Sequence, residues 1–152
     1  LLRIGVVLTP AGGALKRMAP AFRVGLGPKL GSGSQYMSWI SMEDALAGIL
    51  HTLENKTVSG PVNLTAPSPE TNQGFSTQLA RIFSRPCFWG MPSCLIRLLW
   101  GQMGQETLLA SARVKPERLL QTGFEFLYPG LDNALTFQLG SGARPDTIEL
   151  DN

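Results

Sequence analysis

The chain has 152 residues and a mass of 16.4 kDa, with 43% hydrophobic residues, 16% charged residues and a formal net charge of +2. This length suits one ordinary domain with a hydrophobic core, and the composition excludes a disordered chain. Lys and Arg are not clustered, which argues against nucleic-acid binding, because such binding needs a basic stripe that displaces phosphate counterions.

The N-terminal part predicts a buried strand followed by a helix and a second strand. Leu1 to Leu8 is an apolar run interrupted only by Arg3 and Gly5, which is typical of a strand buried on both faces of a parallel sheet. The chain has no starting Met and begins inside this strand, so we expect that sequence precedes it. A helix is expected over 14–22 and a short strand over 36–40.

A second helix is predicted to begin after Ser41. The Ser41 hydroxyl can accept a hydrogen bond from the backbone N–H of Asp44, and the Asp44 carboxylate can reach back to the N–H of Ser41. Apolar positions at helical spacing continue to about Glu54. A further short strand is expected over 62–66.

The rest of the chain is predicted to be mostly helical. Thr71 or Asn72 caps a helix that runs to about residue 83, and Pro116 suits the first position of another helix, which Gly123 ends. Further elements are expected in this order: a strand over 87–91, helices over 93–100, 108–112 and 131–139, and a polar, disordered tail over 140–152. The alternation of strands and helices implies an α/β fold.

Two features of the sequence bear on location and metal binding. Cys87 and Cys94 have only one His to accompany them, which is too few ligands for a zinc site and too few cysteines for a disulfide framework. Buried free thiols in a reducing compartment are the expected state. No apolar run reaches the length of a membrane-spanning helix, and no signal peptide is visible.

Several motifs, in a fixed order, resemble the extended short-chain dehydrogenase/reductase family. Residues 3–8 followed by Gly12-Gly13 resemble its late sheet strand, 37–44 its strand-to-helix segment, and 60–64 its next sheet strand. A narrower resemblance, to an epimerase-like subfamily with an uncharacterised C-terminal domain, rests on residues 12–15, 20–22, 25–27, 31–33, 63–67 and 71–72 and on positions within 114–131.

The resemblance covers residues 1 to about 139 and implies the C-terminal part of a Rossmann-like, NAD(P)-binding fold with a small, mostly helical substrate-side domain. It divides the chain into late sheet strands and a crossover helix (1–66), the C-terminal domain (67–139) and a tail (140–152). The implied function is that of an NAD(P)-dependent epimerase or dehydratase acting on sugar nucleotides. The implied location is the cytoplasm of a bacterium, or a mitochondrion or chloroplast of a eukaryote, and a homodimer is a further expectation.

Gly5, Val6 and Val7 are the expected cofactor-binding residues. The resemblance places the backbone at Val7 beside the nicotinamide end of NAD(P), and open α/β sheets bind ligands at the carboxyl ends of their strands. The alternative is that these residues only fill a buried strand. Lys16 and Arg23 are the expected substrate-binding residues, since both can meet an anion such as a nucleotide diphosphate; the alternative is that both are solvated surface positions.

The sequence departs from the nucleotide-sugar epimerases at the segment around Trp39. Met37 and Ser38 stand where many of those enzymes have a basic residue, and Ser41 replaces the usual His. These departures argue against a nucleotide-sugar substrate. His51 has no Ser, Cys or carboxylate pattern around it, so we expect neither a catalytic nor a metal-binding role for it.

The residues that perform the family's chemistry are absent from this sequence. Hydride transfer depends on a glycine-rich dinucleotide turn and on a Tyr followed four residues later by a Lys. Here Ile40 lies four residues after Tyr36, and Asp132 lies four after Tyr128. We therefore expect an N-terminal half of the same protein, as partner, to supply the catalytic pair and most of the NAD(P) site, and we expect no turnover by this chain alone. The alternative is a non-catalytic interaction module derived from the family, which binds a partner through an exposed sheet edge and apolar face.

Overall fold

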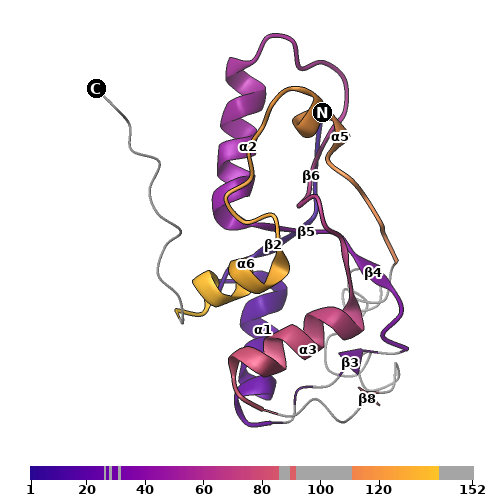
Figure 1. Cartoon of the computed structure of the whole chain (residues 1–152), viewed down its shortest axis with the longest axis vertical. Helices are drawn as coiled ribbons and strands as arrows, with labels where there is room; N and C mark the ends of the chain where they lie inside the picture. The colour runs from indigo at the N-terminus through magenta and orange to yellow at the C-terminus, as the bar shows by residue number, and fades with distance from the viewer. Residues whose placement is uncertain (26, 28, 31, 86–89, 92–110, 141–152) are drawn as a thin grey trace.

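The computed structural model describes residues 1–25, 27, 29–30, 32–85, 90–91 and 111–140, which form an α/β structure. Figure 1 shows α2 and α5 toward one end, α1 and α3 toward the other, and α6 between them. The elements in chain order are β1 (Leu2–Ile4), β2 (Val6–Leu8), α1 (Gly13–Arg23), β3 (Lys29–Leu30), β4 (Tyr36–Met37), β5 (Trp39–Ser41), α2 (Met42–Glu54), β6 (Val62–Leu64), β7 (Glu70–Thr71), α3 (Asn72–Ile82), β8 (Gly90–Met91), α5 (Glu117–Gln121) and α6 (Leu131–Gln138).

The predicted first strand is divided at Gly5 into two strands with different partners. β1 pairs in parallel with β6, and β2 pairs in parallel with β5. The change occurs between neighbouring residues: the N–H of Gly5 donates to Leu64 O at 3.0 Å, and the N–H of Val6 donates to Ser38 O at 2.8 Å. A side chain at Gly5 has no room, because a Cβ there would lie 2.6 Å from Ser38 O.

Both partner strands lie on the same edge of the β1–β2 segment. The N–H of Ala66, just beyond β6, donates to Trp39 O of β5, so the end of β6 runs beside β5. In the part of the chain that the structure describes, no strand pairs with the opposite edge of β1 and β2. A cavity lined by residues of both strands lies beside this segment.

The prediction of burial on both faces is correct only at the end of this segment. Leu8 is fully buried, whereas Ile4 is 52% exposed and Leu2 is 36% exposed. The difference follows from the neighbours, since β2 lies among α1, α2 and α6, while β1 contacts chiefly β6.

The remaining predicted elements agree with the structure except at some boundaries. The strand expected over 36–40 is divided into β4, which pairs antiparallel with β7, and β5. Thr71 is the N-cap of α3, where its Oγ1 accepts from the N–H of Gly74 at 3.1 Å, as predicted. Pro116 occupies the N-cap position of α5, one residue earlier than expected. Some predictions lie outside the described residues, namely those for 86–89, for Cys94, for the helices within 92–110 and for the tail over 141–152.

The buried residues form two hydrophobic clusters, one on each side of β2 and β5. Trp39 belongs to the larger cluster with α1, α3 and α6, whereas the adjacent Ile40 belongs to the smaller one with α2, β6 and α5. This alternation is the period-two pattern of a strand covered on both faces. In the described part of the chain, no helix is both long enough and apolar enough to cross a membrane.

Asp44 connects the start of α2 to the C-terminal segment. The N–H of Asp44 donates to Ser41 Oγ at 2.9 Å, which confirms the predicted cap. The expected return bond to the N–H of Ser41 is wrong, because the carboxylate has other donors. Asp44 Oδ1 accepts from the N–H of Leu127 at 2.7 Å, and Oδ2 accepts from the N–H of Tyr128 at 3.0 Å and from Ser41 Oγ at 2.9 Å.

We expect Asp44→Asn to destabilise the fold by about 2–4 kcal/mol, because the amide turns a donor toward groups that themselves donate, at a buried site. Glu43→Gln is the matched control: Glu43 lies in the same helical turn but is only partly buried and accepts one side-chain bond, from Gln138. Guanidinium unfolding measures both variants. Equal losses of stability would contradict the role assigned to Asp44.

Gly5→Ala is expected to destabilise the chain by about 1–3 kcal/mol, since the added methyl group collides with backbone that cannot move without breaking the β2–β5 pairing. Gly12→Ala is the control, because no atom lies within 4 Å of a Cβ there and its φ of −164° is extended. Thermal unfolding of the two variants compares them, and a Gly5→Ala protein as stable as Gly12→Ala would disprove the tight contact.

Candidate functional site

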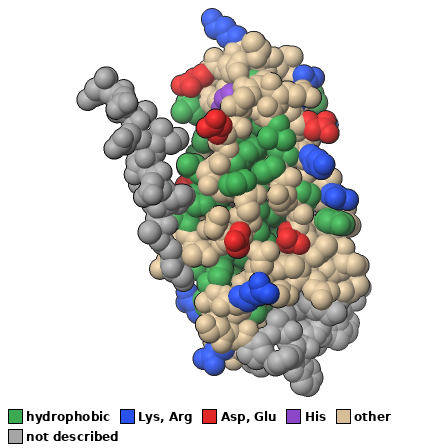
Figure 2. All heavy atoms as spheres, in the orientation of Figure 1, with side chains coloured by type: hydrophobic (Ala, Val, Ile, Leu, Met, Phe, Trp, Pro, Cys, Tyr) green, Lys and Arg blue, Asp and Glu red, His purple; other side chains and the backbone are tan. Residues whose placement is uncertain are grey.

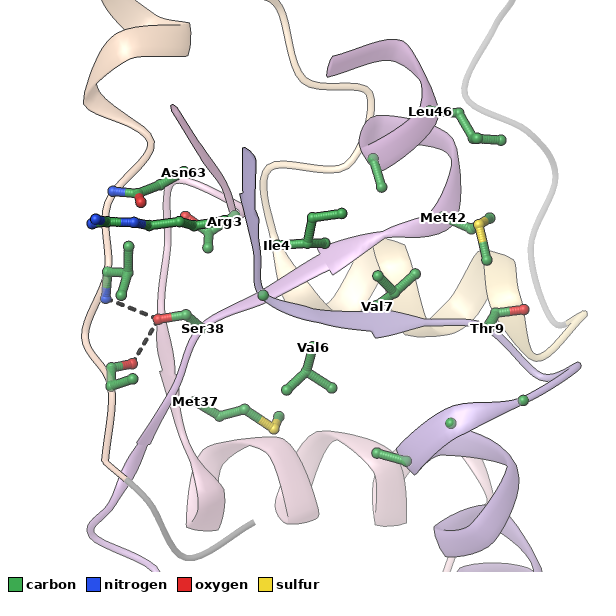
Figure 3. A pocket seen from close by; sticks show the side chains of 18 of the residues that line it. Arg3, Ile4, Val6, Val7, Thr9, Met37, Ser38, Met42, Leu46 and Asn63 are labelled. Atoms are coloured by element: carbon green, nitrogen blue, oxygen red, sulfur yellow. Dashed lines mark hydrogen bonds between the residues drawn. The ribbon is translucent and has the colours of Figure 1, made fainter. Parts of the chain in front are cut away.

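A cavity of about 1070 Å³ opens along the free edge of β1 and β2 (Figure 3). Small-molecule sites commonly have volumes of this order. Successive strand residues face opposite sides, so β2 divides the cavity. Figure 3 shows Val6 and Met37 on one side of β2, and Ile4, Val7 and Met42 on the other.

The structure places the three expected cofactor residues together in this cavity. Gly5, Val6 and Val7 all line it, at and before the carboxyl end of β2. A ligand in the cavity therefore lies where open α/β sheets place their ligands. Val7 belongs to β2, and no described strand pairs with the free edge of β2.

The two expected substrate-binding residues lie outside the cavity lining. Lys16 is exposed on α1, and the Arg23 guanidinium lies over the Phe83 ring, 5.5 Å from its centroid. Arg17, which was not among the predicted residues, lines the cavity instead. Helical spacing could have identified it, because Arg17 lies one turn after Gly13, which also lines the cavity.

The turn between β2 and α1 requires glycine at one position. Gly13 has a φ of +63°, a conformation that residues with a side chain rarely adopt, and Gly12 has open space around it. Both residues line the cavity. The turn thus brings bare backbone to the cavity wall.

The other end of the cavity is polar. Arg3 and Asn63 are neighbours across the β1–β6 pair and lie close to each other in Figure 3. Thr65 lies just beyond β6 and also lines the cavity, and its Oγ1 is buried without a hydrogen-bond partner among the described residues. This end retains hydrogen-bonding capacity for a ligand or for another chain.

Residues 111–115 form a strap along one wall of the cavity, and Ser38 holds it. Ser38 Oγ donates to Ala112 O at 2.6 Å and accepts from the N–H of Val114 at 2.8 Å (dashed in Figure 3). The N–H of Ala112 also donates to Tyr36 O at 3.0 Å. Ala112 and Val114 line the cavity, so this hydroxyl fixes part of the cavity wall.

His51 has a packing role. Its Nε2 lies 2.9 Å from Thr122 Oγ1, and its ring meets Phe124 edge-on with centroids 5.4 Å apart. Phe124 in turn meets Phe126 edge-on at 4.8 Å. Groups of three or more metal-ligating side chains do not occur among the described residues.

We expect Ser38→Ala to release the strap, because two hydrogen bonds at a buried hydroxyl are lost, at a cost of about 1–3 kcal/mol. Trypsin should then cleave faster after Arg113, which lies within the strap. The exposed Ser59→Ala variant controls for the loss of a hydroxyl elsewhere. Cleavage at the same rate in both variants would show that Ser38 does not hold the strap.

Comparisons with known proteins find similarity between this chain and epimerase family proteins. Residues 91–137 match a family described as a domain of unknown function (DUF1731). An epimerase family protein of Mycobacterium bovis is 46% identical over 137 residues, which are 90% of this chain and 46% of that protein.

Solved structures give the same result. The human epimerase family protein SDR39U1, solved with NADPH, matches 92% of this chain and 47% of that chain, with a TM-score of 0.84 and 36% identity. A nucleoside-diphosphate sugar epimerase of Corynebacterium glutamicum matches 95% of this chain and 27% of that chain, with a TM-score of 0.73 and 28% identity. These matches confirm the predicted Rossmann-like α/β fold, and the chain spans less than half the length of each protein.

Proposed function

Because the chain is homologous to the epimerase family proteins and fits the C-terminal half of an extended short-chain dehydrogenase/reductase, we propose that it forms the substrate side of an NAD(P)-dependent, epimerase-like oxidoreductase. The observation that carries this proposal is the cavity at the carboxyl end of β2, beside an edge without a strand partner among the described residues. That is the position in an α/β sheet where a cofactor and its substrate meet.

The residues present fit one end of NAD(P). The backbone of Val7 would lie beside the nicotinamide, with Gly5 and Val6 as neighbours, and the Gly12-Gly13 turn leaves the cavity wall there without side chains. A bound nicotinamide would supply hydride transfer. The chain contains no Gly-x-Gly-x-x-Gly turn for the pyrophosphate and no Tyr followed four residues later by Lys.

We assign those functions to an N-terminal half that pairs with the free edge. A second surface supports such a partner: Leu46, Leu50 and Leu53 of α2 are 61%, 53% and 76% exposed and recur at the spacing of one helix face. On the face that Figure 2 shows, charged side chains are scattered singly, whereas hydrophobic ones gather in its upper half. Exposed apolar surface beside an unpaired strand edge is typical of a protein interface. Alone, the chain is expected to have no turnover.

The same surfaces support the second candidate function, a non-catalytic module that binds a protein partner. The two functions differ in one respect, since only the first requires a dinucleotide to bind when the partner is present. Binding of a partner without NADH or NADPH would favour the module.

The test co-expresses the full 152-residue chain with the N-terminal half of the Mycobacterium bovis relative, as two separate chains. Titration calorimetry with NADPH and NADH should show binding to the pair, at micromolar concentrations, and none to this chain alone. A pair that forms and gives no heat with either cofactor would refute the proposal.

A variant pair locates the interface. Leu50→Asp should prevent pairing, because it puts a charge on the apolar face of α2. Val24→Asp, at an apolar side chain after α1 that is 67% exposed, should leave pairing unchanged. Pairing that survives Leu50→Asp would show that α2 does not face the partner.

A further inference from the structure

The part of the cavity between β2 and α1 has an apolar floor. Val6, Ala14, Met18 and Met37 line it, and we call this part the α1 lobe. Met18 and Met37 are only 4% and 8% exposed and belong to the larger hydrophobic cluster, so the floor of the lobe is continuous with the core. Figure 3 shows Val6 and Met37 directed into the same space below β2.

This floor offers no polar side chain to a ligand. The hydroxyl groups of a sugar or the oxygens of a diphosphate would lose water here without gaining hydrogen bonds, which is unfavourable. Apolar groups would bind well, because the two Met side chains are flexible and adapt to varied shapes. The polar end of the cavity is formed instead by Arg3 of β1, Asn63 of β6 and Thr65, just beyond β6.

The charged lining residues define the rest of the ligand. Arg3 and Arg17 are the charged residues among those that line the cavity, and no Asp or Glu is among them. Arg3 belongs to the polar end, beside Asn63. Arg17 lies on α1 between Ala14 and Met18, so it supplies the positive charge at the α1 lobe.

We infer that the substrate is a largely apolar molecule with one anionic group, such as a carboxylate, and not a nucleotide diphosphate sugar. The apolar part occupies the α1 lobe over Val6, Met18 and Met37, and the anion pairs with Arg17. This inference rests on the proposed function, because it takes the cavity as the substrate side of that site. The α1 lobe adjoins the carboxyl end of β2, where the nicotinamide is proposed to lie.

Three probes separate the alternatives: decanoate, which has both features, decanol, which lacks the charge, and UDP-glucose. Each is titrated into the pair formed with the N-terminal half, with NADPH present, and into the full chain alone if no pair forms. Decanoate should bind most tightly, decanol about tenfold more weakly, and UDP-glucose not measurably. Tighter binding of UDP-glucose than of decanoate, or no binding of decanoate, would overturn the inference.

Matched variants assign the binding to the α1 lobe. Arg17→Gln should weaken decanoate binding about tenfold and leave decanol unchanged, whereas the exposed Arg81→Gln should change neither. Val6→Asn should weaken both ligands about tenfold, and Val24→Asn, at a side chain that is 67% exposed outside the cavity, should weaken neither. Decanoate binding that is unaffected by Arg17→Gln and Val6→Asn would also overturn the inference about the substrate.

These measurements distinguish the two proposals. NADPH binding to the pair without decanoate binding would refute the substrate class and retain the proposed function. Decanoate binding that depends on Val6 and Arg17, with no NADPH binding, would refute the proposed function and retain the ligand site.

Discussion

At Gly5 the chain passes from one strand partner to another, and the site depends on this bend. The residues before Gly5 pair with β6, and the residues after Gly5 pair with β5. Both partners lie along the same edge of the segment. The opposite edge is therefore free along the whole segment, as far as the described residues extend, and the cavity opens beside it. Only glycine fits at the bend, because the Ser38 carbonyl oxygen occupies the space of a side chain.

The C-terminal segment contributes to the same site from a distance in the sequence. Ser38 fixes the strap at Ala112 and Val114, and Asp44 fixes Leu127 and Tyr128. Ala112, Val114, Leu127 and Tyr128 all lie within residues 91–137, the segment that matches the domain of unknown function. Part of that segment thus forms a wall of the cavity.

Local patterns made much of the fold predictable, whereas long-range contacts were not. The caps at Ser41 and Thr71 and the apolar periodicity located α2 and α3, since these signals act within one or two turns. The bend at Gly5 and the strap depend on bonds such as that between Ser38 and Val114, 76 residues apart. The rule that ligands bind at the carboxyl ends of strands placed Gly5 to Val7 in the cavity. The same rule does not predict which basic residue of α1 lines the cavity, because that depends on which face of the helix the cavity contacts. Arg17 lies on that face, and Lys16 does not.

In the proposed pair with an N-terminal half, the free edge of β1 and β2 becomes an interior position of a larger sheet. Amide hydrogen exchange of Leu2, Ile4 and Val7 tests it most directly, because their N–H groups alternate with those bonded to β6 and β5 and so point to the free edge. Addition of the N-terminal half of the Mycobacterium bovis relative should slow exchange at these three amides roughly a hundredfold or more. A complex that forms while these amides continue to exchange at their original rates would contradict the account.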